Sequence, residues 1–129
     1  MKKFAALFIL VVGMLASRPI AAHHGTNAEY DADHKLTFKS ATVTEFAFAN
    51  PHIQIYFDVK DDKGNVAHWA VEGPSPGRLI RMGWKRDDVK VGDQVTIILD
   101  PARNGAAVGY LSKVIYPGGK QLGVVPVLP

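Results

Sequence analysis

Two alternating segments joined by a polar turn constrain the fold of this chain most strongly. In HIQIYFDVK (52–60) every second side chain is apolar, and the alternation returns in VAHWAVE (66–72). A period of two is typical of β-strands with one buried face, and DDKGN (61–65) is typical of a turn, so a β-hairpin is predicted. The register that keeps both apolar sets on one face contains the pairs Lys60–Val66, Asp58–His68 and Phe57–Trp69.

The segment before the hairpin predicts a strand from Leu36 to Ala49, because Thr, Val and Phe are frequent there. Its alternation slips near Glu45, since Val43 and Phe46 cannot both face one side of a regular strand. A β-bulge at this point would reconcile the two positions.

After the hairpin, GPSPGRLIRMGW (73–84) predicts a short helix. Ser75 is placed to cap it, Pro76 suits its first position, and Gly83 is placed to end it. Its apolar side chains are expected to plug one end of a barrel; they are Leu79, Ile80 and Met82.

Two more strands are predicted, one at 94–99 with Val95, Ile97 and Leu99 facing inward, and one at 106–116. Three strands, a helix and two strands is the order of the oligonucleotide/oligosaccharide-binding (OB) barrel. The predicted fold is therefore all-β with one short helix, a five-stranded OB-like open barrel.

The first residues predict export. Lys2 and Lys3 form a basic head, residues 4–15 carry no charge, and Ala21-Ala22 ends the segment, as in a secretory signal peptide cleaved after Ala22. The apolar run is shorter than the roughly 20 residues of a membrane-spanning helix, so no stable anchor is expected after processing. We expect a periplasmic or secreted protein with four parts: signal peptide 1–22, polar arm 23–34, barrel domain 35–124 and tail 125–129.

Cleavage also changes the charge. The whole chain has a formal net charge of +3, and removing Lys2, Lys3 and Arg18 with the signal leaves a neutral protein. A neutral exported protein is not expected to bind nucleic acid. The chain has no cysteine, so its core must hold the fold without disulfides.

Several segments together carry a resemblance to a known family. They are AHHG…AEYD (22–31), NPH (50–52), HWAVEGP (68–74), RMGWKRDDVKVGD (81–93) and SKVIYPGGKQL (112–122). With these segments the chain resembles the small exported bacterial proteins catalogued as domain of unknown function 6152. The resemblance implies an exported, OB-like protein with no established activity. Gly25 departs from the family pattern, which usually has Ser there.

The processed N-terminus is a candidate metal site. At His23 the α-amine and the imidazole Nδ1 belong to one residue, so both can hold one ion, and His24 adds a second imidazole. Nitrogen donors suit Cu(II) first and Zn(II) second. His52 is the expected partner from the barrel, and further donors are available on the arm at Glu29, Asp31, Asp33 and His34. The alternative is a flexible processed end with solvated histidines.

The two hairpin histidines are not expected to share an ion. The register puts His68 opposite Asp58, whereas His52 lies six residues further along, about 20 Å at ~3.3 Å per residue. His68 and Asp58 therefore suggest a structural cross-strand pair. No nucleophile, base and oxyanion set can be assembled, so an enzyme is not expected.

The leading hypothesis is a periplasmic protein that binds copper through His23, His24 and His52. The alternative is a non-enzymatic adaptor that binds a periplasmic protein or small ligand through the barrel face at Trp84, Tyr56 and His68, with the oligomeric state left open. Tyr30 is expected to pin the arm to the barrel.

Overall fold

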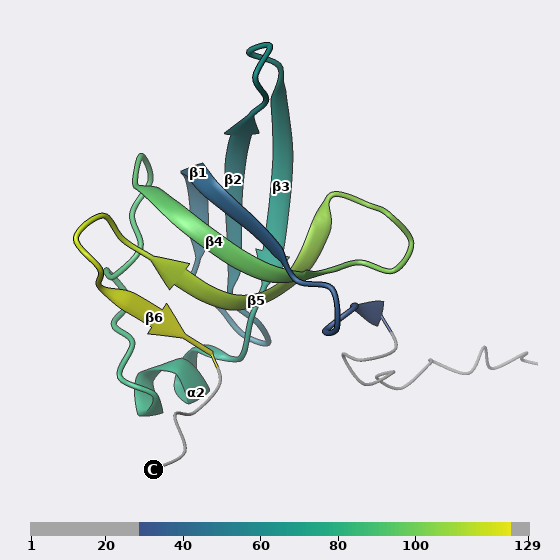
Figure 1. Ribbon diagram of the computed structural model, residues 1–129. Coiled ribbons are helices and arrows are strands. Elements are labelled where there is room, and N and C mark those ends of the chain that lie inside the picture. The colour runs from purple at the N-terminus through teal and green to yellow at the C-terminus, as the bar shows by residue number, and fades with distance from the viewer. Residues whose placement is uncertain (1–28, 125–129) are drawn as a thin grey trace, which may run out of the picture.

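The computed structural model describes residues 29–124 (Figure 1). These residues form β1 (Leu36–Ala47), β2 (Gln54–Lys60), β3 (Val66–Glu72), α2 (Pro76–Arg81), β4 (Gln94–Pro101), β5 (Val108–Ile115) and β6 (Gln121–Gly123). Within this part of the chain, no helix has the length and apolar character needed to cross a membrane.

The strands form one sheet in the order β3-β2-β1-β4-β5-β6, of which the first five make a barrel. β3 pairs in parallel with β5 from Ala70–Val108 to Glu72–Tyr110, and this seam closes the sheet on itself. The predicted OB-like order is confirmed, and the barrel is closed rather than open. In Figure 1, α2 lies beneath the barrel, on the connection from β3 to β4.

The β2–β3 hairpin has the predicted register. Phe57 pairs with Trp69, Asp58 with His68 and Lys60 with Val66. Its turn extends beyond the other strands in Figure 1. The side chain of Asp61 fixes this turn by accepting hydrogen bonds from the backbone of Lys63 and Asn65.

β1 is long because its two ends pair with different strands. It pairs with β2 through Thr42–Ala47 and with β4 through Leu36–Thr42. The predicted bulge is confirmed, since the pairing with β2 shifts between Val43 and Glu45. A second shift, between Phe38 and Ala41, interrupts the pairing with β4. Such irregularities bend a strand and let it curve around a small barrel.

The core consists of the inward side chains of every long strand and Leu79 of α2, together with buried side chains outside these elements: Ile53, Trp84, Val89, Leu122 and Val124. Val95, Ile97 and Leu99 are buried as predicted. The Ser75 side chain caps α2 by accepting a hydrogen bond from Arg78 N, and Gly83 has a φ of 93° after the helix end. The prediction for Ile80 was wrong, because it is 57% exposed; a helix of six residues turns only part of its surface to the barrel.

Residues 81–93 connect α2 to the strands at the lower end of the barrel through two hydrogen bonds. Trp84 is only 3% exposed, and its Nε1 donates a hydrogen bond to Gly123 O of β6 at 2.9 Å. Tyr116 donates to Asp88 O at 2.6 Å from the end of β5. Trp84 therefore belongs to the core and not to an exposed ligand or partner face. Strand β6, whose Gly123 O accepts the hydrogen bond from Trp84, was not predicted from the sequence.

Candidate functional site

The arm is attached to the barrel through Tyr30, as predicted. Its hydroxyl donates to Glu72 Oε1 at 2.9 Å, and its ring packs against Tyr110 with centroids 6.0 Å apart. Its backbone forms a bridge with Ala102. Because Glu72 and Tyr110 are paired at the β3–β5 seam, the arm is attached where the barrel closes.

Two side chains of the arm, Asp31 and His34, contact each other. Asp31 Oδ2 lies 2.9 Å from His34 Nδ1, and Asp31 Oδ1 lies 3.8 Å from the guanidinium of Arg103. The hydrogen bond from His34 is the main reason that the pKa of Asp31 is lowered. Two of the metal donors expected on the arm, Asp31 and His34, are thus hydrogen-bonded to each other, and Asp31 also lies near Arg103.

Two tyrosines make stability sensitive to alkaline pH. Burial, then the hydrogen bond to Glu72, raises the pKa of Tyr30 above its usual 10.0. Burial and the charge of Asp93 raise the pKa of Tyr116 in the same direction. The folded protein favours both neutral phenols, so their contribution is complete below about pH 10 and is lost as pH rises through the raised values.

We therefore expect the free energy of unfolding to fall when the pH rises above 10. Urea denaturation at pH 8 and pH 11 measures this fall. The variant Tyr30→Phe with Tyr116→Phe should lose about 1 kcal/mol per hydrogen bond at pH 8 and should fall less between the two values. An equal fall in the variant and the parent would assign the effect to other groups.

His52 is held in a defined orientation at the entry to β2. Its Nδ1 lies 3.0 Å from Gly73 O. A carbonyl oxygen only accepts hydrogen bonds, so Nδ1 carries the hydrogen and the neutral ring keeps its lone pair on Nε2. Backbone hydrogen bonds hold both sides of this corner, from Ile53 N to Pro74 O at 3.1 Å and from Gly73 N to Ile53 O at 2.9 Å.

His52 and the attachment point of the arm are neighbours. Gly73, which fixes the His52 ring, directly follows Glu72, which holds Tyr30. His23 and His24 lie outside the described residues. His24 precedes Tyr30 by six positions, so the chain between them spans at most about 20 Å.

His68 contacts a carboxylate rather than a backbone carbonyl. Its Nδ1 lies 2.6 Å from Asp58 Oδ1, which confirms the cross-strand pair. The register also separates it from His52, which lies beyond the other end of β2. Within residues 29–124 no group of three or more His, Cys, Asp or Glu side chains could hold a metal ion. A site built on His52 would need donors from outside this range.

Tyr56 lies on the same outer face as His52, and its hydroxyl donates to Gln54 Oε1. Gln54 and Tyr56, but not His52, line a shallow pocket of about 300 Å³ between the arm and the hairpin. Sequence reasoning missed the part that Glu72 and Gly73 play here. Their occurrence together in HWAVEGP was a signal, but Gly73 reaches His52 only once β2 and β3 have paired, and Glu72 contacts Tyr30 only once the arm has folded back.

Comparison with known proteins gives one match. A family model described as a family of unknown function (DUF6152) matches residues 11–112, which is more than half of the chain. No curated protein and no solved structure gave a significant match.

Proposed function

The chain belongs to the DUF6152 family, whose function is unknown, and on that premise we propose that it is an exported protein that binds Cu(II). The ligands are the α-amine and Nδ1 of His23, the imidazole of His24 and Nε2 of His52. Zn(II) is the second choice. In this proposal the protein acts by binding and not by catalysis, and its place of action is the periplasm or the extracellular medium.

The observation that carries the proposal is the fixed ring of His52. Histidines that bind metals commonly donate the hydrogen of the second ring nitrogen to a carbonyl or carboxylate, which sets the tautomer and the ring direction. Gly73 O provides such an acceptor for His52. The ring is exposed, so its Nε2 is accessible to an ion.

The chemistry of the donor set supports copper. Cu(II) has the highest affinity of the common divalent ions for nitrogen sites. An unperturbed α-amine has a pKa of about 7.7–8.0 and a histidine about 6.5, so metal binding near neutral pH displaces protons easily. Two nitrogens from one residue need no preformed cavity, and His52 then ties the ion to the barrel.

Replacing His52 tests the proposal directly. We expect His52→Ala to weaken Cu(II) binding by about tenfold in calorimetric titration of the chain that begins at His23. Electron paramagnetic resonance should show one fewer nitrogen ligand. The matched control is His68→Ala, an exposed histidine on the same hairpin, which should leave both measurements unchanged. Equal loss in the two variants, or no loss in either, contradicts a ligand role for His52.

A further inference from the structure

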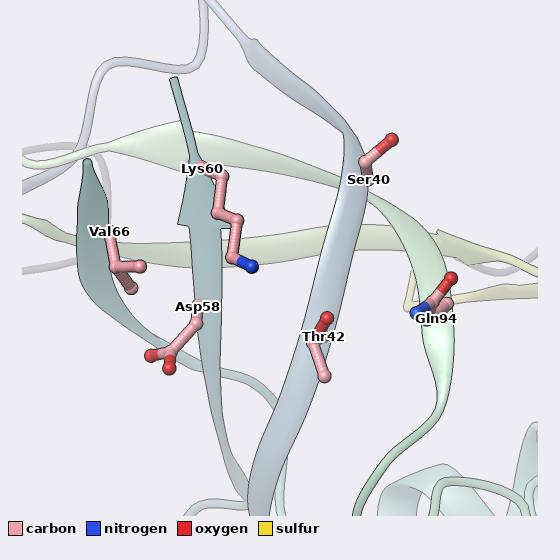
Figure 2. Close-up of a pocket in the computed structure, with 6 residues that line it drawn as sticks. All are labelled: Ser40, Thr42, Asp58, Lys60, Val66 and Gln94. Atoms are coloured by element: carbon pink, nitrogen blue, oxygen red, sulfur yellow. The ribbon is translucent and has the colours of Figure 1, made fainter. Parts of the chain in front are cut away.

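A second candidate binding site lies on the outer face of the barrel, away from the arm. A groove of about 390 Å³ crosses β1, β2 and β3 near the start of β4 (Figure 2). Its lining is polar except for one valine, and consists of Ser40, Thr42, Asp58, Lys60, Val66 and Gln94. None of these residues belongs to the proposed copper site.

The hollow follows from the irregularity of β1. The pairing of this strand shifts between Phe38 and Ala41 and again between Val43 and Glu45, on either side of Thr42. Bulges bend and twist a strand away from its neighbours. The side chains left over the bend, Ser40 and Thr42, are short, so they do not fill the space beside the hairpin.

The charges of the groove are separated. Asp58 turns its carboxylate toward β3, where it meets His68 at 2.6 Å. Lys60 turns its ammonium toward β1, on the side of Thr42 (Figure 2). Among the ion pairs formed within residues 29–124, none includes Lys60. Lys60 therefore forms no ion pair in the described chain, and the one carboxylate of the groove, Asp58, is turned to His68.

We propose that this groove binds a small hydroxylated monocarboxylate, such as a sugar acid. One ammonium matches one carboxylate, whereas a phosphate dianion would bring about two charges to a site without an arginine fork. The hydroxyls of Ser40 and Thr42 and the amide of Gln94 both donate and accept hydrogen bonds, as ligand hydroxyls require. Val66, 44% exposed, provides an apolar wall. The volume lies at the lower end of the range for ligand pockets, so the ligand is small.

The test uses the chain from His23, labelled with ¹⁵N, in a buffer with EDTA, so copper binding cannot contribute. Glucuronate is expected to shift the amide resonances of Thr42, Lys60 and Gln94. Glucose, which lacks the carboxylate, should bind at least about tenfold more weakly, because a charge-assisted hydrogen bond is lost. Inorganic phosphate should also bind more weakly than glucuronate.

Two variants assign the site. Lys60→Met should weaken glucuronate binding at least about tenfold, while Lys63→Met in the hairpin turn, the matched control, should not change it. Both lysines are exposed, so both variants should fold and give the parent spectrum elsewhere. Equal binding of glucose or phosphate, shifts outside the groove, or unchanged binding by Lys60→Met would each overturn the proposal. Loss of copper binding in other experiments would leave it unaffected.

Discussion

Acetylation of the α-amine of His23 is expected to weaken Cu(II) binding by about a hundredfold. It turns the amine into an amide nitrogen and adds no new amine, so the residue no longer offers an amine and an imidazole to the same ion. A second donor on the same residue acts at a high effective concentration, and its loss costs affinity by factors of about 10² or more. Both imidazoles remain, which separates the effect of the amine from that of the side chains.

The experiment compares two purified proteins that both begin at His23, one with a free and one with an acetylated α-amine, in calorimetric titrations with Cu(II). His23→Ala with a free amine should give a loss of similar size, because it removes the other half of the chelate. The same copper affinity in the free and acetylated proteins would refute the N-terminal site. Mass spectrometry of the exported protein checks that the chain begins at His23, and a different first residue would also contradict the proposal.

Trp84→Ala is expected to lower the free energy of unfolding by about 3–5 kcal/mol, the usual cost of removing a large buried aromatic side chain. Trp84 is 3% exposed and packs with the core cluster. Its removal also leaves Gly123 O without the indole donor. Because this contact links the segment after α2 to β6, the loss should loosen the lower end of the barrel. Urea denaturation measures the change.

Trp69→Ala is the matched control. Trp69 is only partly buried and packs against Phe38, with ring centroids 4.8 Å apart. Its replacement should cost about half as much, since less apolar area is lost from the interior. Trp84→Phe should keep most of the packing and lose the hydrogen bond, at about 1–2 kcal/mol. A smaller effect for Trp84→Ala than for Trp69→Ala would contradict the core role.

The sequence predicted best where a local pattern also sets the tertiary contact. Alternation on both sides of a short turn determined the hairpin register, and the misplacement of Phe46 relative to Val43 revealed the bulge. β6 could not be predicted, because Gln121–Gly123 is too short for a pattern and becomes a strand only beside β5. The face of α2 was misjudged at Ile80 for the same reason: six residues hold too little periodicity.

The candidate sites were predictable only in part. The Asp58–His68 pair and the attachment of Tyr30 follow from register and from the polar surroundings of the arm. The orientation of His52 does not, since it depends on Gly73 O, 21 positions away, which reaches the ring only after β2 and β3 have paired. The groove depends on the second shift in β1, between Phe38 and Ala41, which alternation did not reveal.

The pairing order of the strands has a consequence for the newly made chain. One edge of β1 pairs with β4, and the outer edge of β3 pairs with β5, which ends at Ile115. Neither pairing can form before the later strand has been made. Contacts between such distant positions form late and slowly. A chain that emerges from its N-terminus cannot complete this barrel until β5 has been made.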